Sequence, residues 1–202
     1  MKTLYTGITC PDPTFVHTPL IAIRPVTDEE PLCRALATRY DYLLFTSRHA
    51  VIACFGGEWR GFGGEWRVVS IGPATTAALR QAGFTATEQV EHDNSYGVIE
   101  WFASQPRGSV LIPRSSLALD IIPNGLRTLG FSVTTVTAYE TRLPERPQTV
   151  DLSQIDRIVF TSPSTVDNFI RLYGALPADK QLDARGPITA QHLQTKIKEQ
   201  RL

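Results

Sequence analysis

Two similar turns of the chain place hydroxyl side chains directly after a short apolar segment and directly before a segment with helical spacing. A serine at such a position can cap the following helix, because its oxygen accepts hydrogen bonds from backbone N–H groups that lack partners within the helix. The same N–H groups, together with the helix dipole, also attract anions. Capping alone explains each single hydroxyl. The residues concerned are Thr46 and Ser47 in the first turn and Ser162, Pro163 and Ser164 in the second.

A second kind of turn, Gly-Pro followed by a threonine, also occurs twice. Gly72 opens the first copy and Gly186 the second, and Thr75 and Thr189 fall in the first turn of the expected helices. Arg114 follows another apolar segment in the same way. In open α/β sheets, ligands bind beyond the carboxyl ends of the strands, where all of these turns are expected to open. The clustering of these turns therefore favours an anionic ligand.

Several kinds of site are disfavoured by the motifs that the sequence lacks. It contains no P-loop, no G-x-G-x-x-G and no G-x-S-x-G elbow. Its three cysteines, Cys10, Cys33 and Cys54, are widely spaced, and we interpret them as buried free thiols. The four histidines lack the spacing of a zinc site, so no metal is expected. Any chemistry must therefore rely on hydroxyls, backbone amides, an arginine or a tyrosine.

The charge balance and the apolar pattern limit the environment of the protein. Twenty Lys and Arg residues offset twenty Asp and Glu residues, so the formal net charge is zero. A neutral chain is poorly suited to binding nucleic acid or an anionic membrane. No apolar run approaches the roughly 18 residues that span a bilayer, and the first residues carry no long apolar signal core. We therefore expect a cytoplasmic protein.

The alternation of short apolar segments with helical ones predicts an α/β fold. Strands are expected at 43–46, 67–71, 109–112 and 158–161, each followed by a helix. Because these strands are apolar almost throughout, we expect parallel sheets covered on both faces. Pro123 lies inside one of the helical segments and is expected to kink it.

An internal repeat predicts that the chain contains two similar lobes. Residues 41–47 are echoed by 156–162, and 72–77 by 186–190, in the same order and at nearly the same spacing.

One segment is too long for a strand within a single lobe. Residues 131–143 read as extended throughout and would span about 43 Å, whereas a lobe of this size has a radius of gyration of about 13 Å. We therefore expect a strand that crosses to the other lobe, with residues 20–24 as its return partner. A bent strand followed by a loop is the alternative.

Six short motifs together resemble the uroporphyrinogen-III synthase family. Each motif is short and made of common residues, but the six occur in order and in register over about residues 20–192. They are 41–47, 71–77, 110–114, 136–141, 160–166 and 186–190.

The resemblance implies two parallel-sheet α/β lobes joined by a two-stranded β ladder. One lobe is continuous and comprises residues 27–136. The other is discontinuous and combines residues 1–20 with 145–202. The ladder is formed by 21–26 and 137–144.

The resemblance also implies an activity. The family closes the linear tetrapyrrole hydroxymethylbilane into uroporphyrinogen III, inverting ring D and losing water, without a cofactor. Tyr139 matches the family's tyrosine, which would act as the catalytic acid; packing on the ladder is its alternative role. The substrate's eight carboxylates would be held by Thr46, Ser47, Gly72, Thr75, Arg114, Ser162, Pro163, Ser164, Gly186 and Thr189. We expect a monomer with hydroxymethylbilane as its small-molecule partner, in tetrapyrrole (haem) biosynthesis.

The two ends of the sequence depart from the family pattern. A short Pro-rich stretch follows residues 4–6 in place of a full helix, and residues 183–185 are more polar than the strand expected there. The chain also stops soon after residue 193, where the family adds another strand and helix. We therefore expect a reduced discontinuous lobe. This reduction is the best support for the alternative function, a non-catalytic two-lobed protein that binds a tetrapyrrole or another polycarboxylate.

Overall fold

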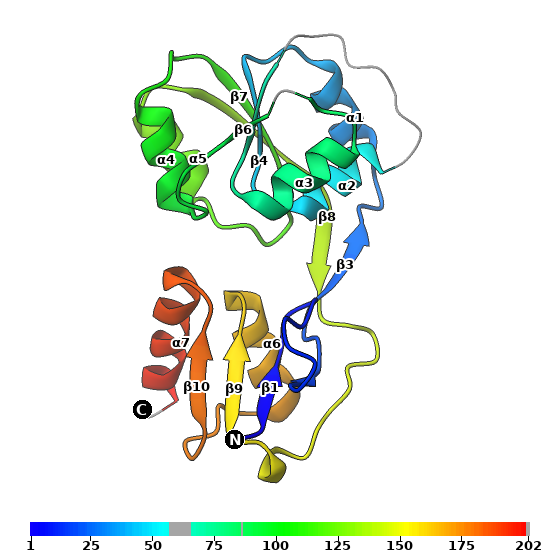
Figure 1. The fold of residues 1–202 in the computed structure, drawn as a ribbon, viewed down its shortest axis with the longest axis vertical. Helices are drawn as coiled ribbons and strands as arrows, with labels where there is room; N and C mark the ends of the chain where they lie inside the picture. The colour runs from blue at the N-terminus through cyan, green and yellow to red at the C-terminus, as the bar shows by residue number, and fades with distance from the viewer. Residues whose placement is uncertain (57–65, 86, 201–202) are drawn as a thin grey trace. The chain divides into compact units, whose positions relative to one another are not determined.

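The computed structural model describes residues 1–56, 66–85 and 87–200 and divides into two compact units (Figure 1). The middle lobe comprises Ile23–Glu140, and the terminal lobe combines Met1–Ala22 with Thr141–Leu202. Each lobe has its own sheet, helices and apolar core. No helix in the described ranges is long and apolar enough to cross a membrane.

The middle lobe is built on a six-stranded sheet with the order β3-β8-β7-β4-β5-β6. All of its pairs from β8 to β6 are parallel, and β3 lies beside β8 with its arrow reversed (Figure 1). The strands are β3 (Ala22–Pro25), β4 (Tyr42–Phe45), β5 (Arg67–Ser70), β6 (Glu88–Gln89), β7 (Ser109–Ser115) and β8 (Ser132–Arg142).

Helices cover both faces of this sheet, as the apolar strands predicted (Figure 1). Side chains of β4 alternate between the two faces, because successive residues of a strand point to opposite sides. Leu43 and Phe45 pack in a cluster with α1, α2 and α3, whereas Tyr42 and Leu44 pack in a cluster with α4 and α5. The helices are α1 (Glu30–Ala37), α2 (Arg48–Phe55), α3 (Pro73–Gln81), α4 (Ser95–Ala103) and α5 (Ile121–Thr128).

The terminal lobe contains a four-stranded parallel sheet with the order β10-β9-β1-β2. Leu4 and Phe160 pack with Phe169 of α6 and Leu193 of α7 in one apolar cluster. Segments from both ends of the chain therefore share this core. The elements are β1 (Thr3–Tyr5), β2 (Val16–His17), the short 3-10 helix η1 (Leu152–Gln154), β9 (Arg157–Phe160), α6 (Pro163–Tyr173), β10 (Gln181–Ala184) and α7 (Pro187–Glu199).

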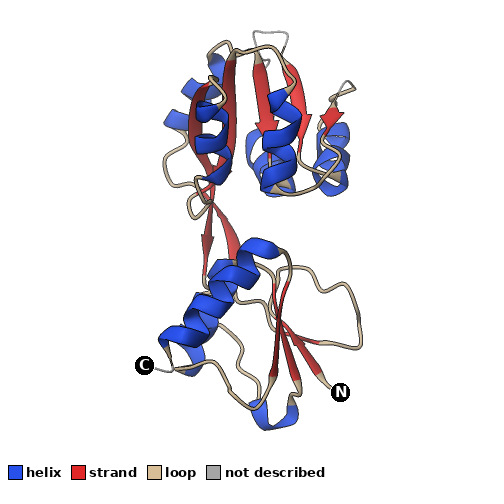
Figure 2. Cartoon of the chain, turned by 90° about the vertical axis from the view of Figure 1, so that its left-hand side faces the viewer, coloured by secondary structure: helices blue, strands red, loops and turns tan. Residues whose placement is uncertain are grey.

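Helical cover on both faces was predicted for the sheets, and this prediction is wrong for the terminal lobe. Helices α6 and α7 contact each other on one face of the sheet (Figure 2). The Tyr5 side chain lies beside the rings of Phe15 and His17, at centroid distances of 6.4 and 6.1 Å. The Pro-rich segment before β2, predicted in place of the family's helix, therefore supplies the ring of Phe15 beside Tyr5.

Three further local predictions differ from the structure. Pro123 was predicted to kink its helix, but it lies in the first turn of α5. An N–H there would have no partner within the helix, so the proline fits without a kink. The polar residues of β10 still form a strand, because they pair with β9 along its full length. The cysteines are free, but none is fully buried, and Cys33 is exposed.

We expect the aromatic cluster of the middle lobe to dominate the stability of that lobe. Phe102 on α4 is fully buried, and its ring lies 5.2 Å from Tyr42 and 5.1 Å from Phe131. Phe102→Ala should lower the free energy of unfolding by about 3–5 kcal/mol, because it removes a buried ring and leaves a cavity. Urea denaturation followed by tyrosine and tryptophan fluorescence measures this change.

Tyr96 on the same helix is the matched control, since 60% of it is exposed. Tyr96→Ala should change the free energy of unfolding by less than about 0.5 kcal/mol. Equal effects of the two substitutions would contradict the assignment of the core.

Candidate functional site

The predicted hydroxyl turn of the middle lobe lies at the carboxyl end of β4. Ser47 is the N-cap of α2, and its Oγ accepts a hydrogen bond from the backbone N–H of His49 at 3.1 Å. Thr46, which precedes it, is half-buried. The prediction that Ser47 caps a helix is confirmed, while its contact with a substrate stays a prediction.

The Gly-Pro turn of the same lobe follows β5 and begins α3. Gly72 is the N-cap of α3, and Thr75 is the third helical residue, 4% exposed. A Cβ atom at Gly72 would lie only 2.8 Å from the Cβ of Asp93, so glycine lets these two segments approach closely. Within the described residues, no side chain caps this helix N-terminus.

The terminal lobe repeats both kinds of turn. At the end of β9, Ser162 caps α6 in a capping box with Thr165, Pro163 is the first helical residue and the half-buried Ser164 the second. At the end of β10, Gly186 begins α7 with φ +88°, a value that favours glycine.

The two helices that follow Gly-Pro turns are alike. Thr189 occupies the same helical position in α7 as Thr75 in α3 and is equally buried. No side chain in the described part of the chain caps α7 either. The repeat seen in the sequence therefore produces two uncapped helix N-termini, one in each lobe.

Tyr139, the predicted catalytic residue, is held against the turn that follows β4. It lies in β8, is 7% exposed, and its ring centroid is 5.9 Å from that of His49. Burial raises the pKa of the Tyr139 phenol, and a hydrogen bond with the Ser47 side chain opposes that rise. The phenol therefore keeps its proton at neutral pH.

Arg114, predicted to bind substrate, is engaged within its own loop. It lies in β7, and only 14% of its side chain is exposed. Its Nη1 donates to a carboxylate oxygen of Asp120 at 2.8 Å, and its Nη2 donates to the backbone carbonyl of Ala118. A contact of Arg114 with a substrate carboxylate stays a prediction.

His49 contacts the predicted catalytic tyrosine, although no sequence pattern pointed to it. Burial lowers the pKa of the His49 imidazole, and the charge of Arg48 lowers it further. The ring is therefore neutral at neutral pH and packs against Tyr139 without a positive charge. Its position two residues after a helix-capping serine was the available signal, but nothing local indicated that a tyrosine more than eighty residues later would contact it.

The structure brings some of the predicted residues together within the middle lobe and assigns others to the terminal lobe. Ser47 and Tyr139 are in contact, whereas Gly72 and Thr75 follow the neighbouring strand β5 of the same sheet. Ser162, Pro163, Ser164, Gly186 and Thr189 belong to the terminal lobe. No group of His, Cys, Asp and Glu side chains in the described ranges is arranged to hold a metal ion.

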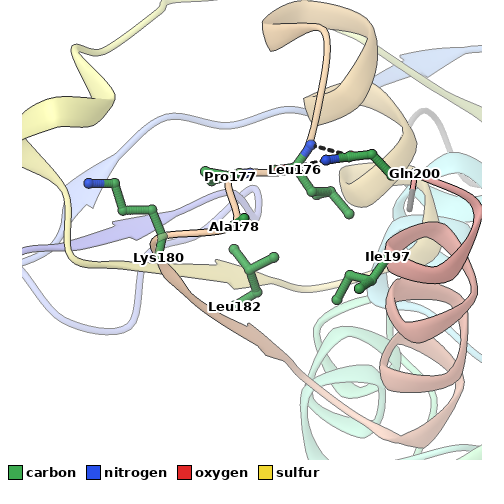
Figure 3. Close-up of a pocket in the computed structure, with 7 residues that line it drawn as sticks. All are labelled: Leu176, Pro177, Ala178, Lys180, Leu182, Ile197 and Gln200. Atoms are coloured by element: carbon green, nitrogen blue, oxygen red, sulfur yellow. Dashed lines mark hydrogen bonds between the residues drawn. The ribbon is translucent and has the colours of Figure 1, made fainter. Parts of the chain in front are cut away.

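A cavity of about 270 Å³ lies in the terminal lobe (Figure 3). It lies at the amino end of β10, between the segment that enters this strand and the last turn of α7. The backbone of Leu176 and the side-chain amide of Gln200 close one side with two hydrogen bonds of 2.8 Å. Lys180 also borders the cavity, but its side chain extends away from the apolar residues Leu182 and Ile197 (Figure 3). None of the predicted site residues lines this cavity.

The lowered pKa of His49 predicts a pH dependence of stability. The folded state resists protonation of this ring, whereas the unfolded chain protonates near the ordinary value of 6.5. Below that pH the unfolded state binds more protons, so the free energy of unfolding falls as the pH decreases. His49→Gln should therefore lose less stability than the unmodified protein between about pH 7.5 and about pH 5.

Chemical denaturation at the two pH values measures the difference. His92→Gln is the control, because 61% of the His92 side chain is exposed. If His49→Gln and His92→Gln show the same pH dependence, the burial of His49 does not contribute to it.

Comparison with known proteins places the chain in a family. Residues 14–199 match the family model described as uroporphyrinogen-III synthase HemD. A Methanothermobacter thermautotrophicus protein that carries the provisional name uroporphyrinogen-III synthase is 28% identical over 182 residues, which cover 81% of this chain and 72% of the relative.

Solved structures show the same fold at low sequence identity. A mutant uroporphyrinogen III synthase from the extremely thermophilic bacterium Thermus thermophilus superposes with a TM-score of 0.66 at 19% identity, covering 96% of this chain and 88% of that one. The uroporphyrinogen-III synthetase of Helicobacter pylori gives 0.62 at 16% identity, covering 100% and 89%. With the family match over nearly the whole sequence, the chain belongs to the uroporphyrinogen-III synthase family, hydro-lyases of tetrapyrrole biosynthesis that need no cofactor.

Proposed function

We propose that this protein converts hydroxymethylbilane into uroporphyrinogen III, with loss of water and inversion of ring D. The observation that carries the proposal is the buried, protonated Tyr139 beside the turn at the end of β4. A reaction that expels hydroxide as water needs a proton donor, and a phenol that holds its proton at neutral pH can supply one. Family membership supports the choice of substrate.

The carboxylates of the substrate are held mainly by the N-termini of α3 and α7. Ser47 and Ser162 already bond to the N–H groups of their own helices, whereas α3 and α7 begin with glycine and proline and have no side-chain cap among the described residues. The N–H groups and dipole of such a helix start favour an anion. The hydroxyls of Thr75 and Thr189, one in each of these first turns, add further donors.

Tyr139 starts the reaction by protonating the hydroxyl of the substrate. The carbon–oxygen bond breaks, water leaves, and the resulting electrophilic carbon is attacked by the substituted position of ring D. The spiro intermediate then rearranges, and the proton released when the ring system regains its aromatic form returns to the tyrosinate. Unassisted closure would give the unrearranged isomer, so the protein's main task is to orient ring D and to exclude water.

The direct test is an isomer-resolved assay. Freshly made hydroxymethylbilane is incubated with the protein in the presence of a strong chelator, and the type I and type III products are separated after oxidation. We expect type III to predominate at an unchanged rate with chelator. If only type I forms, as in buffer alone, while the protein still binds a tetrapyrrole, the non-catalytic binding function replaces the synthase.

We propose that residues 21–26 and 137–144 form the connection between the lobes, supported by the neighbouring positions of β3 and β8 in one sheet. We propose further that the protein acts as a monomer in the cytoplasm. Membership of the uroporphyrinogen-III synthase family, whose members are generally cytoplasmic, supports the location.

Tyr139→Phe isolates the proposed acid, because it removes one oxygen and keeps the ring packed against His49. We expect kcat to fall on the order of 100-fold, the lower range for general acid catalysis. The fraction of type I product should rise, because unconverted substrate closes spontaneously. A variant that keeps nearly full activity would show that Tyr139 only packs on β8.

Loss of one hydroxyl in a helix start should have a smaller effect. A neutral hydrogen bond contributes about 0.5–1.5 kcal/mol net, and the helix N–H groups remain. We therefore expect Thr75→Val and Thr189→Val each to reduce kcat/KM by about tenfold or less. A loss far beyond tenfold in either variant, with nearly full activity in Tyr139→Phe, would contradict the role of Tyr139. It would indicate that the proton donor lies near that threonine.

A further inference from the structure

The loop between β7 and α5, residues 116–120, exposes two large apolar side chains. Leu117 is 54% exposed and Leu119 is 51% exposed. Covering a large exposed apolar side chain is favourable in free energy, because it removes apolar surface from water. Two of them within three residues make a small apolar surface at the carboxyl end of β7.

This loop is fixed in place rather than loosely attached. Arg114, itself largely buried, binds the carbonyl of Ala118 and the carboxylate of Asp120 and so joins the start of the loop to its end. The N–H of Leu117 donates to Ser115 Oγ at 3.2 Å, and the N–H of Ala118 donates to the carbonyl of Ser115 at 3.1 Å. The positions of the two leucines are therefore set before any ligand binds.

The same loop is attached directly to the segment that carries the proposed acid. The N–H of Ser116 donates to the carbonyl of Tyr139 at 3.0 Å, at the place where a bulge separates Arg114 from Ser115. Leu117 directly follows Ser116, so the Cα atoms of these two residues are about 3.8 Å apart. The loop that carries the apolar surface therefore begins beside the backbone of Tyr139.

We propose that Leu117 and Leu119 form a preset surface for one pyrrole ring of the tetrapyrrole, and that Arg114 is the positioning residue that holds this surface beside Tyr139. The inference rests on the proposed function. A tetrapyrrole offers flat, largely apolar rings as well as carboxylates, and its carboxylates suit the helix starts. A ring lying on the leucines covers them and removes water from the side of the substrate where the electrophile forms.

Paired substitutions test the contact. Leu117→Ala, Leu119→Ala and the double variant are compared with Ile52→Ala, which removes an equally exposed apolar side chain from α2. Uroporphyrin III binding is measured by its fluorescence, which does not depend on turnover. We expect the double variant to bind about tenfold more weakly, and Ile52→Ala to bind as the unmodified protein does.

The reaction itself gives a second readout. If water captures the electrophile, the substrate re-forms with an oxygen atom from the solvent in its hydroxyl group. In heavy-oxygen water, the leucine variants should return more labelled substrate and more type I product per turnover than Ile52→Ala. Leucine variants that match Ile52→Ala in binding, labelling and isomer ratio would overturn the proposal.

Arg114→Gln separates positioning from direct binding. If Arg114 holds the loop, amide exchange at Ser116 and Leu117 accelerates in the free protein, and Asp120→Asn causes the same change to a smaller extent. If Arg114 instead holds a substrate carboxylate, Arg114→Gln weakens uroporphyrin III binding but leaves exchange in the free protein unchanged. That result would contradict its positioning role.

The outcomes also distinguish this inference from the proposed function. An unmodified protein that makes no type III product disproves the synthase, whether or not the leucines bind a ring. If the protein makes type III product and the leucine variants behave as the control does, the synthase function is supported. Only the proposed ring surface is then contradicted.

Discussion

Parallel pairing of buried strands determines where every candidate site residue lies. In the middle lobe, β4 sends Leu43 and Phe45 to one apolar cluster and Tyr42 and Leu44 to the other. A shift of one residue would exchange the two faces, so the core fixes the register. Because paired strands run in the same direction, the turns after β4, β5 and β7 all open at one edge of the sheet. The turns after β9 and β10 share an edge of the terminal sheet in the same way.

The helix starts after β4, β5, β9 and β10 divide into two chemical classes. Those that follow Thr-Ser carry an internal cap, as Ser47 and Ser162 show, so their N–H groups are already partly satisfied. Those that follow Gly-Pro have no side-chain cap within the described residues. The duplicated sequence therefore repeats a pair of turns in each lobe, one whose serine caps the following helix and one without a side-chain cap among the described residues.

Features that depend on neighbours in the sequence were predictable from it. The capping serines, the proline at the first position of α6 and the alternation of strands and helices follow from local patterns. Features that depend on distant partners were not predictable. Nothing near Arg114 in the sequence distinguishes an arginine that awaits a carboxylate from one that binds Ala118 and Asp120. Likewise, the contact between His49 and Tyr139 arises only once β8 is placed in the sheet, and the exposed Cys33 shows that residue type alone does not determine burial.

We propose that a tetrapyrrole binds to turns at the carboxyl ends of the strands, at the starts of α3 and α7. Amide hydrogen exchange with and without uroporphyrin III tests this claim residue by residue. We expect slower exchange in the ligand-bound protein at the starts of α3 and α7 and in the loop 116–120, with no change around the cavity bordered by Leu176 and Ile197. Protection confined to that cavity, or protection of neither helix start, would contradict it.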